Sequence, residues 1–308
     1  MNIVFDSIIV IVCITGLWFG AVWIVDSASK IAKRLGLSDL VIGLTIVAIA
    51  TSSPEFAVSV SAAIKGHTQI SVANVIGSNI FNLGIILGII LLFTNLKTNK
   101  VLLYRDGFFL LFAGLILILF FINLELSRLE GIILFSFLII YVVFLFLYKK
   151  EVELPEIQIG KTSWYDVPLL ILGVATVVAS GHFFTESASN VAKELGVSEW
   201  LIGITIVGAG TSAPEFATAF VAAVKKKVDM SAGALIGSDI FNVLGVLGIS
   251  AIFNPLVISN EDYFSLLIML FSYVILIIMI RHKWQLSRNE GIILILLALF
   301  RWLFVFTI

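Results

Sequence analysis

Hydrophobic residues form long runs along the chain, and short polar segments separate them. A transmembrane helix needs about 20 apolar residues. The runs lack the period-2 alternation of barrel strands and are rich in Leu, Ile, Phe and Gly. The pattern predicts an all-α membrane protein with ten transmembrane helices, near residues 3–28, 40–64, 70–94, 103–123, 130–148, 165–185, 200–224, 230–253, 263–281 and 290–308.

Composition supports this class. Hydrophobic residues make up 60% of the 308 positions and charged residues only 13%, and the mean hydropathy is +1.14. These values exclude an ordinary soluble protein. Cys13 is the only cysteine, which rules out an internal disulfide. The chain has no Gly-x-x-x-x-Gly-Lys-Ser/Thr run, so we expect ion gradients rather than a nucleotide to drive it.

Basic residues gather in alternate connections between the expected helices. Of the 19 Lys and Arg residues, 15 lie near one side of the predicted membrane. Such residues face the cytoplasm by the positive-inside rule, which predicts that both termini lie outside. The 15 are Lys30, Lys33, Arg34, Lys97, Lys100, Arg105, Lys149, Lys150, Lys161, Lys225, Lys226, Lys227, Arg281, Lys283 and Arg288.

The chain repeats itself at an offset of 160 residues. Residues 26–49 align without a gap on 186–209, and Gly-Ser-Asn-Ile-Phe-Asn at 77–82 matches Gly-Ser-Asp-Ile-Phe-Asn at 237–242. Each half carries five expected helices, and an odd number inverts the second copy in the membrane. We therefore expect two inverted-topology five-helix repeats, 1–148 and 165–308, joined by a short cytoplasmic linker, 149–164.

Each half contains a proline and a glutamate within an apolar run. The motifs are Ala-Thr-Ser-Ser-Pro-Glu at 50–55 and Gly-Thr-Ser-Ala-Pro-Glu at 210–215. Pro54 and Pro214 cannot donate to the carbonyl four residues back, so we expect kinks that free the carbonyls of Ala50 and Gly210. Irregular backbone at membrane depth is tolerated where it lines a cavity or is buried in protein.

Oxygen-bearing side chains accompany these kinks. Thr51 and Glu55 are four residues apart, as are Ser78 and Asn82, and the second half repeats both pairs with Thr211, Glu215, Ser238 and Asn242. Hard cations such as Ca2+ prefer carboxylate, amide, hydroxyl and carbonyl oxygens. The three histidines, His67, His182 and His282, fall near expected helix ends and do not cluster.

The two glutamates need compensation inside the membrane. A buried carboxylate costs at least about 2.5 to 3.5 kcal/mol on insertion scales, and two close together repel each other. A divalent cation neutralises both, while several Na+ ions or protons would serve instead. An alternative is that they are structural acids paired with lysines, but no Lys or Arg lies in the middle of an expected helix.

Other acids fit structural roles. Ser127 with Glu130, and Ser287 with Glu290, have the spacing of capping boxes. Asp26 precedes Lys30 by one helical turn and is expected to pair with it. Asp239 is an extra acid, one turn from Asn242, that either tunes the oxygen cluster or lies in a vestibule.

The paired Thr-Ser-x-Pro-Glu and Gly-Ser-x-x-x-Asn motifs resemble the two α-repeats of the cation/calcium antiporter superfamily, and in particular its sodium/calcium exchangers. The resemblance implies a central diamond of Glu55, Asn82, Glu215 and Asn242. Around it, the resemblance implies the side chains of Thr51, Ser52, Ser78, Thr211, Ser212 and Ser238 and the carbonyls of Ala48 and Gly208. It also implies that the first and sixth helices slide across the other eight.

These observations predict a secondary antiporter that exchanges Na+ for Ca2+ at a midplane site. The resemblance implies Asp at position 242 in a potassium-dependent exchanger, so Asn242 argues against K+ co-transport. The Gly-Asn-x-x-Glu pattern typical of proton/calcium exchangers is absent, which favours Na+ over H+ as the counter-ion. A proton/calcium exchanger and a passive cation channel remain alternatives. An intramembrane protease lacks its usual motifs, so we expect no enzyme. We expect no cofactor. The expected partners are Ca2+, Na+ and the lipid bilayer, without nucleic acid or nucleotide. The expected location is a prokaryotic plasma membrane.

Overall fold

The protein is all-helical and crosses the membrane several times. A computed structural model describes residues 3–147, 164–197, 202, 206 and 208–307. These residues contain seven helices long and apolar enough to span a bilayer, or eight when one bent pair is counted as a single span. The bent pair joins Asp39–Thr51 to Ser53–Ile64 at an angle of 50°. The predicted all-α membrane class is therefore confirmed.

The first half follows its predicted runs closely. Several helices change to π-helical geometry for five or six residues and continue without a break. The elements are α1 (Ile3–Leu35), α2 (Asp39–Ile42), η1 (Gly43–Val47, π), α3 (Ala48–Thr51), α4 (Ser53–Ile64), α5 (Thr68–Ile80), η2 (Phe81–Ile86, π), α6 (Leu87–Phe93), β1 (Leu96–Lys97), η3 (Leu102–Gly107, π), α7 (Phe108–Phe120), η4 (Phe121–Asn123, 3-10), β2 (Glu125–Leu126) and α8 (Arg128–Leu147).

The second half repeats this order. Its elements are α9 (Asp166–Glu194), α11 (Gly208–Gly210), α12 (Ala213–Val224), α13 (Val228–Ile240), η6 (Phe241–Val246, π), α14 (Leu247–Phe253), β3 (Leu256–Val257), α15 (Asn260–Lys283), β4 (Gln285–Leu286) and α16 (Arg288–Thr307). The expected run at 200–224 is represented by α11 and α12, because most of residues 198–207 lie outside the described part.

Unusual backbone features recur at the 160-residue offset. The π-helical segments η2 and η6 occupy equivalent positions. Leu124 and Trp284, also equivalent, both have left-handed backbone with φ of 64° and 53°. Left-handed backbone is uncommon for residues other than glycine, and π-helices are rare. The sequence repeat therefore extends to local backbone geometry.

Two short β-ladders link the halves. β1 pairs antiparallel with β4, so that Leu96 lies opposite Leu286, and β2 pairs with β3, so that Leu126 lies opposite Leu256. At the 160-residue offset β1 corresponds to β3, and β2 to β4. Each ladder therefore joins a strand of one half to the non-equivalent strand of the other.

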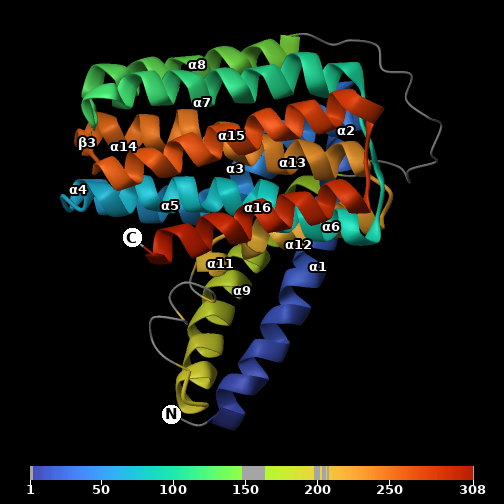
Figure 1. Cartoon of the computed structure of the whole chain (residues 1–308). Coiled ribbons are helices and arrows are strands. Elements are labelled where there is room, and N and C mark those ends of the chain that lie inside the picture. The colour runs from blue at the N-terminus through green and yellow to red at the C-terminus, as the bar shows by residue number, and fades with distance from the viewer. Residues whose placement is uncertain (1–2, 148–163, 198–201, 203–205, 207, 308) are drawn as a thin grey trace.

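The helices α1 and α9 form a separate antiparallel pair. In Figure 1 they lean away together from the bundle formed by the other helices. Lys30 near the end of α1 forms a 3.2 Å ion pair with Asp166 at the start of α9. At the other end of the pair, Asn190 donates to Asp6 at 3.3 Å. At the 160-residue offset Asn190 corresponds to Lys30, and Asp166 corresponds to Asp6. Both contacts therefore join position 30 of one half to position 6 of the other.

These contacts correct one expectation. Asp26 does not pair with Lys30, as the helical spacing suggested, but with Lys225 at 2.6 Å. Lys30 reaches across to the second half instead. Local spacing could not reveal this, because both partners come from distant parts of the chain.

The capping box of Ser127 and Glu130 is confirmed, and one of the two bonds of the box of Ser287 and Glu290 is present. Glu130 accepts from the Ser127 backbone N–H at 2.7 Å, and Ser127 Oγ accepts from the Glu130 N–H at 3.3 Å. In the second half, Glu290 accepts from the Ser287 backbone N–H at 2.9 Å. Glu130 and Glu290 therefore serve the starts of α8 and α16.

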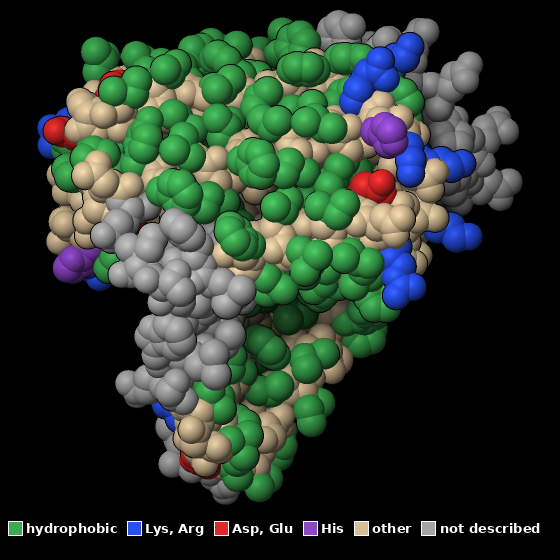
Figure 2. All heavy atoms as spheres, viewed as in Figure 1, with side chains coloured by type: hydrophobic (Ala, Val, Ile, Leu, Met, Phe, Trp, Pro, Cys, Tyr) green, Lys and Arg blue, Asp and Glu red, His purple; other side chains and the backbone are tan. Residues whose placement is uncertain are grey.

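The surface fits a lipid environment. Figure 2 shows hydrophobic side chains over most of the visible face, while the Lys and Arg side chains in view are concentrated at one end. Large apolar side chains such as Ile11 and Ile140 are more than half exposed. An apolar surface of this extent is rare on soluble monomers.

Candidate functional site

Each of the two glutamates begins a helix after a break. α3 ends at Thr51 and α4 begins at Ser53, with Pro54 in its first turn. α12 begins at Ala213, with Pro214 in its first turn. Glu55 and Glu215 therefore lie at the positive ends of helix dipoles, where negative charge is favoured. The predicted kink is confirmed in the first half, where the bend is 50°.

The backbone at the first break differs from the prediction in one respect. The Ala50 carbonyl, which Pro54 deprives of its helix partner, accepts a hydrogen bond from Ser53 Oγ at 2.8 Å. It is therefore not a free carbonyl. The Ala48 carbonyl accepts from the Ser52 N–H at 3.0 Å and from Thr51 Oγ1 at 3.3 Å. Gly208, its equivalent, is the first residue of α11.

Serine hydroxyls from both halves surround each carboxylate. Ser52 donates to Glu215 Oε1 at 2.9 Å, and Ser238 donates to the same oxygen at 3.3 Å. The Ser52 and Ser238 hydroxyl oxygens are 2.5 Å apart. Glu215 is thus bonded by Ser238 from its own half and by Ser52 from the other half.

Glu55 has the equivalent surroundings. Ser78 donates to Glu55 Oε1 at 3.1 Å, and Ser212 donates to it at 3.3 Å. The Ser78 and Ser212 hydroxyls are 3.0 Å apart. In both networks the serines use only one carboxylate oxygen, which leaves the other oxygen available.

The asparagines lie where α-helix changes to π-helix. Asn82 is in η2 and Asn242 in η6, and both are fully buried. Asn82 Nδ2 donates to Ser238 Oγ at 3.3 Å and to Asp239 Oδ1 at 3.0 Å. Asn242 Nδ2 donates to Asn79 Oδ1 at 2.9 Å. Since π-helical segments are frequent at functional sites, this geometry supports a role for both asparagines.

Five buried acceptor oxygens in this cluster have no hydrogen-bond partner within the described residues. They are Glu55 Oε2, Asn82 Oδ1, Glu215 Oε2, Asp239 Oδ2 and Asn242 Oδ1. The Glu55 and Glu215 side chains are 0% and 1% exposed, so water at the surface does not solvate them. Buried acceptors of this kind are costly unless a donor or a cation satisfies them.

Ion pairs do not compensate the two carboxylates in the described part of the chain. The salt bridges there include Lys30–Asp166, Arg105–Asp106 and Lys225–Asp26, and none of these three involves Glu55 or Glu215. The described residues also contain no group of three or more His, Cys, Asp or Glu side chains with metal-binding geometry. The cluster is therefore rich in amide and hydroxyl oxygens around few charges, a composition that suits hard cations.

An adjacent set of polar residues was only partly predicted. Asn79 Nδ2 donates to the Asp239 backbone carbonyl at 3.1 Å and to the Tyr273 hydroxyl at 2.9 Å. Tyr273 comes from α15 and also lies next to the Asp239 side chain. Asp239 is fully buried and bonded to Asn82, so it belongs to the cluster and not to a vestibule. The sequence signal for this contact was a tyrosine in the largely apolar middle of α15.

A cavity of about 300 Å³ approaches the two breaks from the side of α9. Pro54, Pro214, Thr211 and His182 are among its lining residues. The position of His182 corrects its expected place near a helix end, because α9 continues to Glu194. Thr211 lines this cavity, whereas Thr51 contacts the Glu215 carboxylate.

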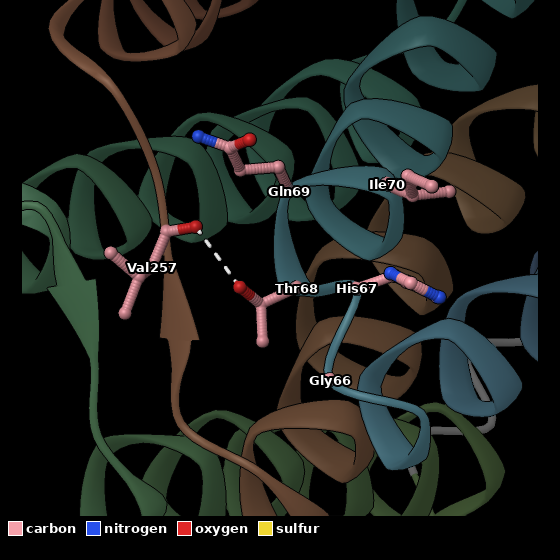
Figure 3. A pocket seen from close by; sticks show the side chains of 6 residues that line it. All are labelled: Gly66, His67, Thr68, Gln69, Ile70 and Val257. Carbon is pink, nitrogen blue, oxygen red and sulfur yellow. Dashed lines mark hydrogen bonds between the residues drawn. The ribbon is translucent and has the colours of Figure 1, made fainter.

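A second pocket lies elsewhere, between the loop after α4 and strand β3. Figure 3 shows its lining residues, with Thr68 Oγ1 donating to the Val257 carbonyl at 3.3 Å. The lining is Gly66, His67, Thr68, Gln69, Ile70 and Val257. It contains no carboxylate, so it lacks the charge that distinguishes the central cluster.

A helical membrane protein with two similar halves and buried oxygens at matching places has the organisation of a secondary transporter. The model of the family described as sodium/calcium exchanger protein matches residues 6–147 and 166–307. The chain therefore belongs to the sodium/calcium exchanger family, whose members are transporters and not enzymes.

Relatives agree with this assignment. The chain is 32% identical to the sodium/calcium exchanger MaX1 of Methanosarcina acetivorans, with 90% of this chain and 91% of that protein covered. It is 28% identical to the inner membrane protein YrbG of Escherichia coli, covering 91% and 92%. The solved structure of the sodium-calcium exchanger NCX_Mj matches with a TM-score of 0.85 and 26% identity, covering 97% of this chain and 98% of that one.

Proposed function

We propose that the protein is an antiporter that exchanges Na+ for Ca2+ at the central oxygen cluster. The observation that carries this proposal is the group of four unpartnered, buried acceptor oxygens of Glu55, Asn82, Glu215 and Asn242, contributed by both halves. A cation placed among them would satisfy atoms that otherwise remain costly. The name of MaX1 and the match to NCX_Mj support Na+ as the counter-ion.

The proposed ligands are those expected from the sequence. Glu55, Asn82, Glu215 and Asn242 form the centre, and the hydroxyls and carbonyls come from Thr51, Ser52, Ser78, Thr211, Ser212, Ser238, Ala48 and Gly208. One Ca2+ and several Na+ ions would compete for overlapping oxygens, since both are hard cations. That competition couples the two fluxes, because the two glutamates are costly to bury without a compensating cation.

We also propose ten membrane-spanning helices in two inverted repeats, 1–148 and 165–308, joined by the linker 149–164. The crosswise β-ladders and the reciprocal contacts of α1 with α9 support an approximate twofold relation between the halves. The concentration of basic residues at one end supports that end as cytoplasmic and both termini as external. The separation of α1 and α9 from the bundle supports alternating access by movement of this pair.

The test is Ca2+ uptake by purified protein in liposomes loaded with Na+. The Na+ gradient and a proton gradient are imposed in separate experiments, and liposomes without protein serve as the control. Uptake that requires internal Na+ is the expected result. Uptake that follows only the proton gradient would replace Na+ by H+ as counter-ion, and uptake without either gradient would indicate a channel.

A further inference from the structure

The two central asparagines are held by the same contact, made in opposite directions between the halves. Asn82 donates its amide N–H to Asp239 Oδ1 at 3.0 Å, and Asn242 donates to Asn79 Oδ1 at 2.9 Å. At the 160-residue offset Asn82 corresponds to Asn242, and Asn79 to Asp239. In first-half numbering, position 82 of each half therefore donates to position 79 of the other half.

This contact determines which end of each amide faces the other ligands. A side-chain amide carries its donors on the nitrogen and its acceptor on the oxygen. Once Nδ2 is bonded to Asp239 or Asn79, Oδ1 must point elsewhere. The Oδ1 atoms of Asn82 and Asn242 are both buried and unpartnered among the described residues. A reversed amide would present N–H groups, which repel a cation.

The acceptors are themselves held in place. Asn79 uses its own Nδ2 for the Asp239 carbonyl and the Tyr273 hydroxyl, so its Oδ1 is directed toward Asn242. Asp239 needs no such orientation, because both of its carboxylate oxygens are acceptors. The side chains of Asn79, Asp239 and Tyr273 are essentially fully buried, which limits the other hydrogen-bond partners that they could take.

We infer that Asn79 and Asp239 are positioning residues that aim the carbonyl oxygens of Asn82 and Asn242 at the transported cation. This inference rests on the proposed ion-exchange function. What each position requires is an acceptor oxygen, and the negative charge of Asp239 is not the requirement. Residues that orient metal ligands typically contribute about 10- to 100-fold to metal affinity.

The experiment compares variants that remove the acceptor with variants that retain it. Asp239→Leu and Asn79→Leu remove it at similar volume, while Asp239→Asn and Asn79→Asp keep it and change the charge in opposite directions. The double variant Asn79→Asp with Asp239→Asn exchanges the two side chains between the halves. The half-saturating Ca2+ concentration and the maximal rate of Na+-driven uptake are measured for each.

The Leu variants should raise the half-saturating Ca2+ concentration by about tenfold or more, whereas the acceptor-retaining variants should stay within about threefold of wild type. Ser272→Ala is the control, because it removes a hydroxyl of the same helix, α15, that donates to the Ile268 carbonyl and takes no part in the two amide contacts. Ca2+-dependent thermal shifts in detergent should give the same order and require no transport.

Two results would overturn the inference. One is wild-type Ca2+ affinity in the Leu variants. The other is a double variant as weak as the Leu variants, which would make the charge at position 239 the requirement, and this test remains if a Leu variant does not fold. Failure of the proposed function is separate, since it requires that wild-type protein shows no Na+-dependent Ca2+ uptake.

Discussion

Ser52 donates a hydrogen bond to Glu215 across 163 residues of sequence, and the two atoms are 2.9 Å apart. The equivalent bond from Ser212 to Glu55 is 3.3 Å long. Each half therefore supplies a donor to the carboxylate of the other. The central oxygen cluster is therefore held together by single hydrogen bonds between the two halves.

Substitution of Ser52 by Ala should weaken Ca2+ transport more than Ser212→Ala does. Hydrogen bonds to charged groups contribute about 1.5 to 3 kcal/mol, which corresponds to roughly 10- to 100-fold in affinity, and the Ser52 bond is the shorter one. The half-saturating Ca2+ concentration of uptake measures the effect. Ser53→Ala is the control, because the exposed Ser53 hydroxyl donates to the Ala50 carbonyl and not to a carboxylate. Equal, small effects of all three substitutions would contradict this prediction.

Removal of either central charge should abolish exchange. Glu55→Gln or Glu215→Gln keeps the shape of the side chain but removes one of the charges available to a divalent cation. We expect Na+-driven Ca2+ uptake to fall to the level of protein-free liposomes. Glu130→Gln changes an acid in a capping box, where a glutamine oxygen can still accept from the Ser127 N–H, and should retain uptake with little loss of stability. Robust uptake by both central variants would show that these carboxylates are not ligands.

The contact between α1 and α9 should not tolerate even one added methyl group at Gly20. A Cβ atom there would lie 2.9 Å from Val177 Cγ1 and 3.0 Å from the Gly173 carbonyl oxygen. Overpacking of this kind costs about 1 to 3 kcal/mol. Gly20→Ala should therefore lower the melting temperature in detergent, and Gly107→Ala, whose Cβ has its nearest neighbour at 3.4 Å, should not. An unchanged melting temperature for Gly20→Ala would mean that the pair adjusts freely.

Lys227, in the turn before α13, should make stability depend on alkaline pH. Burial lowers the pKa of Lys227 from 10.5, although Asp39 and Asp26 oppose the shift. The unfolded chain then binds this proton more tightly than the folded chain, so the free energy of unfolding rises with pH between the lowered value and 10.5. The stability of wild type relative to Lys227→Met should increase over that range.

Melting temperatures measured at several pH values test this, with Lys226→Met as a matched exposed neighbour. A difference between wild type and Lys227→Met that stays constant as the pH approaches 10.5 would contradict the assignment.

Much of the site could be predicted because its signals are local. Pro54 and Glu55 within an apolar run specify a break and a buried charge, and the repeat at Pro214 and Glu215 doubles the evidence. The same holds for Ser78 and Asn82, which are one turn apart. Short-range spacing and internal repetition were sufficient to bring these residues together in the prediction.

Other features depend on contacts between distant segments. Nothing near Asp26 indicates that Lys225 will be its partner, and nothing near Asn79 indicates Tyr273. The π-helical geometry around Asn82 also lacks a clear sequence signal. The cap that Ser53 places on the Ala50 carbonyl is local, but the loss of a helix partner alone predicted a free carbonyl there.

The crosswise strand pairing has a consequence for the origin of the chain. A single half would leave both of its two-residue strands with open edges, and its glutamate would lack the serine that the other half supplies. Two identical halves related by a twofold axis would repair each of these defects through the same reciprocal contacts. An ancestral polypeptide equivalent to one half is thus expected to have worked as an antiparallel homodimer before gene duplication and fusion joined its two copies. After fusion the copies were free to diverge, and Asn79 and Asp239 record that divergence.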